Sequence, residues 1–157
     1  STLSSSSAAS DVYKRQLHAL MLWQPGIPML YRGDEEGQLN DSSYKQDPKK
    51  AGDSRYLHRG SFPWKLAEEA QKNKDSIPGR LFEGLRRLEE FRAREAAMAG
   101  DARCSVLEME NPHILCLQRE KDGQKLTGLF NFSGESQNVF QKDLCLEPYG
   151  FRVIKQE

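Results

Sequence analysis

The residues best suited to chemistry lie in one short stretch, YRGDEEGQLND, which covers positions 31–41. It places four carboxylates within eight positions: Asp34, Glu35, Glu36 and Asp41. Two carboxyl groups, one charged and one protonated, are the means by which many enzymes cleave glycosidic bonds. Neighbouring side chains on a tight turn point in different directions, however. Gly33 and Gly37, on either side of the triplet Asp34-Glu35-Glu36, favour a turn with positive φ. The stretch is therefore a candidate for a catalytic centre or for the rim of one.

The segment before these carboxylates has the pattern of a helix followed by a buried strand. Apolar residues at positions 17, 20, 21 and 23 predict the last turns of a helix. Pro25 and Gly26 end it, because proline cannot continue the hydrogen-bond ladder and glycine accepts a left-handed turn. Residues 27–31 form a short apolar run, which is typical of a strand buried on both faces of a parallel sheet. Polar residues at the carboxyl end of such a strand lie where α/β barrels carry their active-site loops.

The segment after the carboxylates is predicted to be a long loop and then a helix. Residues 38–74 show no sustained period, and loops of that length are usually functional or disordered. Interleaved aromatic residues favour an ordered loop, with a short helix over residues 65–72. Pro78 and Gly79 open a stronger helical pattern that ends near Gly100, with a charged face typical of a solvated helix. Its apolar stripe consists of Leu81, Phe82, Leu85, Leu88 and Phe91.

After Gly100 the pattern changes to short strands separated by turn residues. Asn111-Pro112 marks one turn, and Asp122-Gly123 is a strong hairpin signal. Evenly spaced short strands at the end of a chain predict a small antiparallel β-sandwich. The predicted architecture is thus barrel-like α/β followed by all-β, with the boundary near Gly100. A half-barrel cannot bury its own sheet edge, so the helix stripe is expected to lack partners. The expected strands cover residues 104–109, 113–119, 125–132, 137–141 and 144–155.

The charge balance argues against several classes of partner. Lys plus Arg and Asp plus Glu both number 23, so the formal net charge is zero and there is no basic excess for nucleic acid. The apolar run over residues 17–23 is far too short to span a bilayer. We expect no nucleic-acid partner and no membrane insertion, and the sequence leaves the oligomeric state open.

The cysteines and histidines form no pattern of metal ligands. The three cysteines, at positions 104, 116 and 145, are irregularly spaced and lack a CxxC pair. This argues against a disulfide framework or a zinc site. Three reduced, buried thiols in a cytoplasmic protein are the expectation. The histidines at positions 18, 58 and 113 also lack ligand spacing, so no metal is expected.

The first sixteen residues, STLSSSSAASDVYKRQ, differ from the rest of the chain. They are rich in Ser and Ala and show neither a strand nor a helix period. They also resemble translated adapter sequence found at the ends of gene fragments. We expect residues 1–16 to be a non-native or disordered leader.

Several motifs resemble one known family. GIPMLYRGDEEGQLND is similar to the eighth strand and following loop of the α-amylase superfamily, glycoside hydrolase family 13. DSSYKQDPKKAGDSRYLHRG, PGRLFEGLRRLEEFR and LEPYGFRVIK follow in the order and spacing of the amylosucrases. The motifs cover most of residues 23–91 and the terminal strand. Over residues 100–141 the similarity rests on the β pattern and on LFNFS at residues 129–133. The resemblance implies the C-terminal portion of a (β/α)8 barrel over residues 17–100 and a β-sandwich domain over residues 101–157.

The resemblance also implies a reaction. Amylosucrases transfer glucose from sucrose to an α-glucan and release fructose, by a retaining double displacement that needs no cofactor. The family takes its nucleophile and acid from the ends of barrel strands four, five and seven, which precede every motif present here. No catalytic carboxylate is therefore expected in this chain. Asp34 and Glu35, together with Asp53, are assigned to the rim of the site.

Arg55 is the one residue that the resemblance assigns to the substrate pocket. In amylosucrases the arginine of an Asp-Ser-Arg-aromatic motif closes the floor of the glucose pocket by pairing with an upstream aspartate. Here the motif begins at Asp53, and a guanidinium offers fixed donors suited to a carboxylate and to sugar hydroxyls. Tyr56 stands where the family usually has tryptophan, and Gly52 where an acid is common. The alternative is a local surface pair between Arg55 and Asp53.

Other assignments fit the shared strand-eight motif. One alternative is another α-glucosidase, a sucrose hydrolase or a sucrose phosphorylase of the same superfamily. Another is a non-catalytic carbohydrate-binding or structural β-domain with an extended N-terminal arm. An upstream barrel containing the nucleophile and acid would distinguish the enzymes from the binding domain.

Overall fold

The computed structural model describes residues 2–140 and 144–156. By their internal contacts the residues fall into two compact units, Ser1–Met29 with Glu83–Glu157, and Leu30–Phe82. We call the first the sheet unit and the second the loop unit, and each is described by itself. The domain limits expected at residues 16 and 100 stay predictions.

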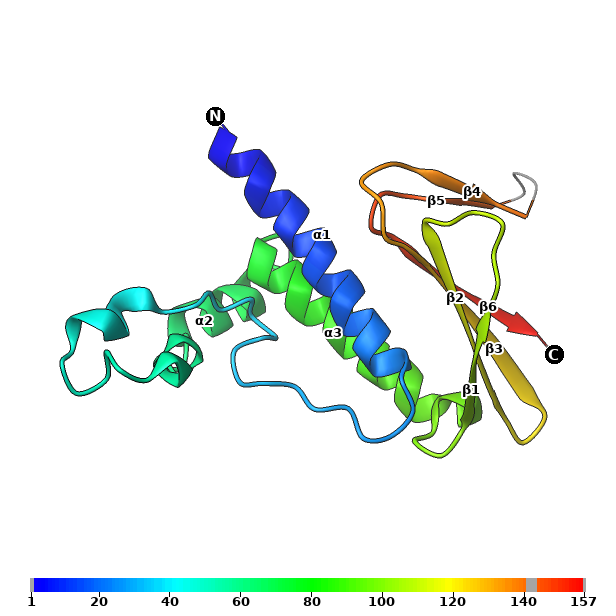
Figure 1. The fold of residues 1–157 in the computed structure, drawn as a ribbon, viewed down its shortest axis with the longest axis horizontal. Coiled ribbons are helices and arrows are strands. Elements are labelled where there is room, and N and C mark those ends of the chain that lie inside the picture. Colours follow the sequence, from blue (N-terminus) through cyan, green and yellow to red (C-terminus); the bar gives the residue numbers. More distant parts are fainter. Residues whose placement is uncertain (1, 141–143, 157) are drawn as a thin grey trace. The chain divides into compact units, whose positions relative to one another are not determined.

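The sheet unit is built around four antiparallel strands in the order β1-β2-β3-β6 (Figure 1). These strands span Arg103–Leu107, Ile114–Lys121, Gln124–Asn131 and Phe151–Gln156. A separate two-stranded pair consists of β4 (Gln137–Val139) and β5 (Leu144–Leu146). The hairpin predicted at Asp122-Gly123 is confirmed, with φ of 51° and 80°. The last predicted strand is instead divided into β5 and β6 by a turn, because Pro148 has no N–H to give to a ladder.

Both faces of the four-stranded sheet are covered, because side chains alternate along each strand. On one face, a buried cluster joins the strands to helix α1 (Thr2–Trp23) and the 3-10 helix η3 (Ala96–Met98). We call it the helix-face cluster; its members include Trp23, Leu117 and Phe130. On the other face, Cys116 and Leu129 pack with residues of the β4–β5 pair. This second layer has only two short strands, so the described residues do not form a sandwich of two full sheets.

Two arginines hold the C-terminal end of α1. Arg119 of β2 donates to the carbonyl oxygens of Trp23 and, at 2.5 Å, Ala99. The last carbonyl groups of a helix lack helical partners, and the helix dipole favours a positive charge near them. Arg119 supplies both a hydrogen-bond donor and a positive charge. Arg119 is 0% exposed, and burial lowers the pKa of its guanidinium. The second arginine, Arg92, donates to carbonyl oxygens on either side of Trp23, those of Leu22, Gln24 and Gly26.

Helix α3 spans Ile77–Arg94, so it begins one residue before Pro78 and ends before the predicted limit near Gly100. Its solvated face is as predicted, since Arg86 pairs with Glu83 at 3.3 Å and Glu90 at 2.5 Å. The expectation that its apolar stripe lacks partners is wrong. Leu81 and Leu85 are 1% and 3% exposed, and the later stripe residues Leu88 and Phe91 pack against the helix-face cluster.

Helix α1 begins at Thr2, within the segment expected to be a leader. Gln16 is 1% exposed, and its Nε2 donates to the carbonyl oxygen of Asn131 at 2.5 Å. The described part of the segment is therefore helical rather than disordered. Its non-native origin stays a prediction.

Residues 27–31 form no strand. Ile27, Met29 and Tyr31 are 91%, 82% and 55% exposed, so these residues are not a strand buried on both faces. A buried parallel strand needs a hydrogen-bonding neighbour on each side, and none of the described residues provides one. The last barrel strand implied by the resemblance is thus not formed by these residues, whereas the long loop and the helix expected after it are present.

The three cysteines are free thiols with different exposures. Only Cys116 is buried, whereas Cys104 is half-buried and Cys145 is exposed. The expectation of three buried thiols is wrong at the last position because Cys145 lies between Leu144 and the buried Leu146 in β5, on the side that alternation turns outward.

Candidate functional site

The carboxylate turn lies in the loop unit and is closed by its own backbone. The N–H of Gln38 donates to the carbonyl oxygen of Gly33 at 2.8 Å, and that of Gly37 donates to Asp34 at 3.1 Å. Gly33 and Gly37 have φ of 92° and 73°, as predicted for the glycines beside the triplet. The φ of 92° at Gly33 is strained for any side chain, and a Cβ there would also meet the Gln38 side chain, so this position favours glycine.

The three consecutive carboxylates of the turn have different environments. Glu35 accepts a hydrogen bond from the Gly33 N–H at 3.1 Å, which turns its carboxylate back on the turn. Asp34 is half-buried. Glu36 is 8% exposed, and its Oε2 has no hydrogen-bond partner in the described structure. Burial, and secondarily the charge of Glu35, raises the pKa of Glu36 above its usual value. No local pattern in the sequence distinguishes Glu36 from the other two carboxylates, because burial depends on the fold of the whole loop.

Asp53 and Arg55 form a bidentate pair at the start of the 3-10 helix η2 (Ser54–His58). The Arg55 Nε donates to Asp53 Oδ1 at 2.8 Å, and its Nη2 donates to Oδ2 at 2.8 Å. Asp53 also caps the helix by accepting the Arg55 backbone N–H at 3.0 Å. These bonds lower the pKa of Asp53 to about 2. The Arg55 side chain is 70% exposed, so the described residues show the local surface pair.

The loop unit brings together the two segments that the sequence analysis singled out. Four hydrogen bonds of 2.9 Å join residues 32–41 to residues 57–61. They link Arg32 to Gly60, Gln38 to Ser61, Asn40 to His58, and Asp41 to Leu57. The cavity between these segments measures only about 40 Å³, which is too small for a sugar. The bonds to Leu57 and His58 hold residues 32–41 beside the 3-10 helix η2, which also contains Arg55.

The rest of the loop unit is ordered by short helices, as the interleaved aromatic residues predicted. The 3-10 helix η1 spans Ser42–Gln46 and helix α2 spans Trp64–Lys72, close to the predicted residues 65–72. Phe62 and Trp64 meet edge to face with ring centroids 4.7 Å apart. The ammonium group of Lys50 lies 5.7 Å from the centre of the Tyr56 ring. The Tyr56 ring thus lies within cation–π range of an ammonium group of the same loop.

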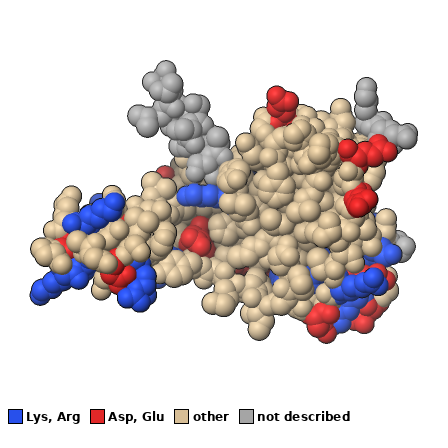
Figure 2. All heavy atoms as spheres, in the orientation of Figure 1, with Lys and Arg blue, Asp and Glu red and all other residues tan. Residues whose placement is uncertain are grey.

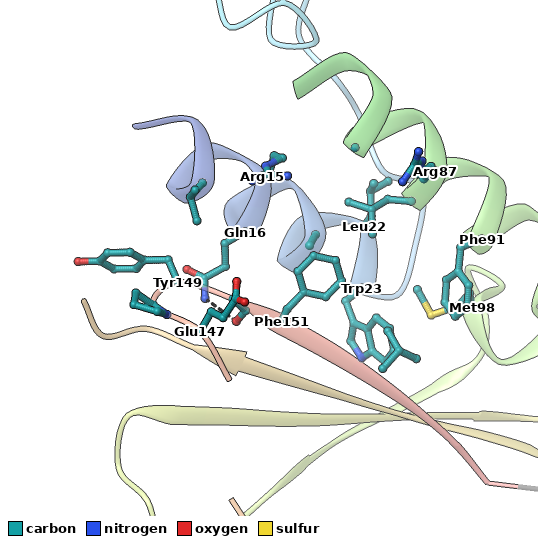
Figure 3. A pocket seen from close by; sticks show the side chains of 17 residues that line it. Arg15, Gln16, Leu22, Trp23, Arg87, Phe91, Met98, Glu147, Tyr149 and Phe151 are labelled. Atoms are coloured by element: carbon teal, nitrogen blue, oxygen red, sulfur yellow. Dashed lines mark hydrogen bonds between the residues drawn. The ribbon is translucent and has the colours of Figure 1, made fainter. Parts of the chain in front are cut away.

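The sheet unit contains a larger cavity of about 510 Å³ between α1, α3 and the segment leading into β6. Figure 3 shows that Trp23, Phe91, Met98 and Phe151 surround it, with Gln16 and Glu147 at one end. Its walls are mainly apolar and offer no pair of carboxylates. This cavity has no set of side chains suited to glycoside chemistry.

The charge distribution, the metal-ligand groups and the helices of the described residues each bear on a prediction from the sequence. Figure 2 shows positive and negative side chains mixed on the visible face. No group of three or more His, Cys, Asp or Glu suited to a metal ion occurs in residues 2–140 and 144–156. Across the same residues, no helix combines the length and the apolar composition needed to cross a membrane.

A comparison with protein-family models finds no match, but the chain resembles several solved structures. It matches the ligand-free cyclic α-maltosyl-(1→6)-maltose hydrolase from Arthrobacter globiformis with a TM-score of 0.66 at 23% identity. This match covers 91% of the chain and 30% of the hydrolase. The trehalulose synthase MutB from Pseudomonas mesoacidophila MX-45 gives 0.67 at 17% identity, over 92% of the chain and 38% of the synthase. The maltogenic amylase from S. marinus gives a TM-score of 0.65 at 19% identity, over 92% of the chain and 19% of the amylase.

These neighbours are enzymes of glycoside hydrolase family 13. At these identities the likeness shows a shared fold. The chain spans between 19% and 38% of the length of the three structures. Its helices and antiparallel strands therefore have the fold of one part of such enzymes.

Proposed function

We propose that this chain is the C-terminal part of an amylosucrase-like enzyme that transfers glucose from sucrose to an α-glucan and releases fructose, with no cofactor. The main observation in support of the proposal is the set of hydrogen bonds that joins the two motif segments of the loop unit. Residues 32–41 are hydrogen-bonded to residues 57–61, at and after the end of the 3-10 helix η2, and that helix carries Arg55 with its side chain exposed. The likeness to family 13 enzymes supports the class of the parent, and the order of the motifs favours an amylosucrase within it.

In this proposal Asp53 holds Arg55 ready for a second carboxylate. The pair uses Nε and Nη2 of Arg55, so the other terminal nitrogen is not engaged by Asp53. An upstream aspartate bound there would close the pocket behind one glucosyl unit, which admits sucrose and excludes a longer chain. Asp34 and Glu35 would lie on the rim. The nucleophile and the acid would come from residues outside this chain.

A hydrolytic parent is the second candidate, because one solved neighbour is a hydrolase. The full-length parent incubated with sucrose distinguishes the possibilities. Fructose in excess of free glucose, together with glucan formation, indicates transfer. Equal amounts of fructose and glucose indicate hydrolysis, and glucose 1-phosphate formed with added phosphate indicates a phosphorylase.

The assignment of Arg55 is tested in the same full-length enzyme. Arg55→Ala should lower kcat/KM for sucrose by about 100-fold, because the floor of the pocket no longer positions the glucosyl unit. Arg59→Ala is the matched control, since Arg59 is also an exposed arginine of this loop, and it should change little. Near-native kcat/KM for Arg55→Ala, or equal damage from Arg59→Ala, would show that Arg55 is not on the floor.

The 157-residue chain alone should have no activity on sucrose or α-glucans. The proposal places both catalytic carboxylates upstream, so nothing in this chain can form the glucosyl-enzyme intermediate. Turnover of sucrose by the purified chain above a buffer control would contradict the proposal.

A further inference from the structure

The cavity between α1, α3 and the segment leading into β6 is far larger than a packing defect. Protein interiors contain few voids larger than a water molecule, and the cost of an empty cavity rises with its volume. At about 510 Å³ this cavity falls within the range of sites for small ligands, roughly 300–1,000 Å³. Its described lining residues all belong to the sheet unit, so the loop unit is not needed to form it.

The apolar walls of the cavity are held in place by their own contacts. The Trp23 Nε1 donates to the Leu117 carbonyl oxygen at 3.2 Å, and the indole ring meets the Phe130 ring edge to face. Phe151 stacks on the same Phe130 ring with centroids 5.9 Å apart. Cavities with apolar walls stay dry and take up apolar small molecules. This part of the cavity therefore suits an apolar ligand body.

Gln16 adds a polar group at the end of the cavity away from Met98 (Figure 3). Its Nε2 donates to the carbonyl oxygens of Asn131 at 2.5 Å and Gly150 at 3.5 Å. These carbonyls fix the orientation of the amide, because only its nitrogen can donate to them. The Gln16 Oε1 is buried, and no described atom donates a hydrogen bond to it. A buried acceptor without a donor is costly, so a ligand that carries a donor would satisfy it.

The charged residues of the lining favour a neutral ligand. Arg15 is half-buried but is already paired with Asp11, at 3.7 Å. Arg87 and Glu147 are exposed to solvent. An ionised ligand would lose its hydration in this cavity without gaining a buried partner of opposite charge, which is costly.

We propose that this cavity binds a small neutral molecule with an apolar body and one hydroxyl group, which donates to the Gln16 Oε1. The apolar body would lie against Trp23, Phe91 and Phe151. A medium-chain alcohol is the simplest molecule of this class. The site involves neither Arg55 nor sucrose, so the inference goes beyond the proposed function.

The test is a titration of the 157-residue chain with 1-octanol, followed by fluorescence. The chain has two tryptophans, so a Trp64→Phe background leaves Trp23, in the cavity wall, as the reporter. The matched ligand is 1-methoxyheptane, which is of similar size but cannot donate a hydrogen bond. The Kd of 1-octanol should be lower by about fivefold, the effect of one net hydrogen bond.

Filling the cavity should block it. Ala19 lines the cavity and is 2% exposed, so Ala19→Leu should raise the Kd of 1-octanol by about tenfold or more. The same variant should raise the Tm of the ligand-free chain, because it fills a void. Leu88→Phe fills the cavity from α3 and serves if Ala19→Leu does not fold. Ala96→Leu is the control, since Ala96 is exposed and is not among the described lining residues, and it should leave the Kd unchanged.

Three results would overturn the proposal: no binding of 1-octanol, equal or tighter binding of 1-methoxyheptane, or an unchanged Kd in the folded cavity-filling variants. An equal rise in Kd for Ala96→Leu would also overturn it, because binding would then not depend on the cavity. None of these measurements involves sucrose. A parent enzyme that fails to use sucrose would disprove the proposed reaction and leave these titrations to be judged by themselves.

Discussion

Gly128 of β3 lies directly beneath the indole ring of Trp23, and replacing it by alanine should destabilise the sheet unit. A Cβ at this position would lie 2.7 Å from the Trp23 Cε2, 2.9 Å from its Cζ2 and 3.0 Å from the Phe130 Cε2. The indole ring cannot retreat freely, because its Nε1 donates to the Leu117 carbonyl oxygen at 3.2 Å. It also meets the Phe130 ring edge to face at 6.1 Å between centroids.

The expected cost follows from these contacts. Inserting a methyl group into a packed core typically costs about 1–3 kcal/mol. Removing a glycine from the unfolded chain offsets about 0.4–1 kcal/mol of this. The net loss should be about 1–2 kcal/mol, or a fall in Tm of about 4–16 °C for a unit of this size.

The assay is thermal and urea unfolding followed by tryptophan fluorescence. The chain has two tryptophans, so a Trp64→Phe background leaves Trp23 as the only reporter. In a further Trp23→Leu background, unfolding is followed by circular dichroism and Gly128→Ala should no longer destabilise. The difference between backgrounds measures the coupling between the two positions.

Gly84→Ala is a control with the opposite sign. Gly84 lies inside α3, where alanine is favoured over glycine by about 1 kcal/mol. Its Cβ would meet only the flexible side chain of Arg15, at 3.1 Å. If Gly128→Ala is as stable as its parent while Gly84→Ala shows the expected gain, the packing argument is refuted.

Three further predictions concern polar groups. Asn131→Asp should lower the free energy of unfolding in urea by about 2–4 kcal/mol at pH 7, since a carboxylate would face carbonyl oxygens that now accept from Asn131 at 2.7 and 2.9 Å. An Asn131→Asp variant as stable as the wild type would contradict this. Burial raises the pKa of Glu36, so folding disfavours its charged form, and Glu36→Gln should slow hydrogen exchange in the loop unit at pH 7. The slowing of hydrogen exchange should vanish as the pH falls below the usual pKa of 4.5, because Glu36 is then protonated in both the folded and the unfolded chain. A slowing that does not depend on pH would count against burial as the cause. The pKa of Asp53 is lowered to about 2 by Arg55, so the stabilisation by this pair should be present above the usual pKa and lost as the pH falls toward 2. Its carboxyl carbon should titrate in NMR near pH 2, and at a higher pH in Arg55→Leu, which removes the side-chain bonds but keeps the backbone N–H bond that also lowers this pKa; equal midpoints would show that the Arg55 side chain is not the cause.

The elements that could be predicted from the sequence are those with a strong local pattern. The stripe from Leu81 to Phe91 predicted α3, and the Asp122-Gly123 pair predicted the β2–β3 hairpin. The alternative local pairing of Asp53 with Arg55 was also readable, because the two residues are only two positions apart.

The features that were missed depend on distant parts of the chain. The run at residues 27–31 has the composition of a buried strand, but a strand also needs neighbours to pair with. Arg119 falls in a predicted strand and no local pattern marks it, yet it is fully buried and donates to a carbonyl oxygen at the end of α1. The burial of Glu36 has the same origin, since no local pattern distinguishes it from Glu35.

The two arginines at the end of α1 also bear on how the protein emerges from the ribosome. Arg92 lies 70 positions after Leu22, and Arg119 lies 96 positions after Trp23. At a synthesis rate of about 5–20 residues per second, Arg119 appears about 5–20 s after the helix end that it holds. Contacts between such distant positions also slow folding, because a long loop must close first. Until Arg92 and Arg119 are synthesised, the C-terminal end of α1 lacks their hydrogen bonds, and the exposed apolar residues 27–31 follow directly after it. This is the period of translation in which such a nascent chain would most need a chaperone.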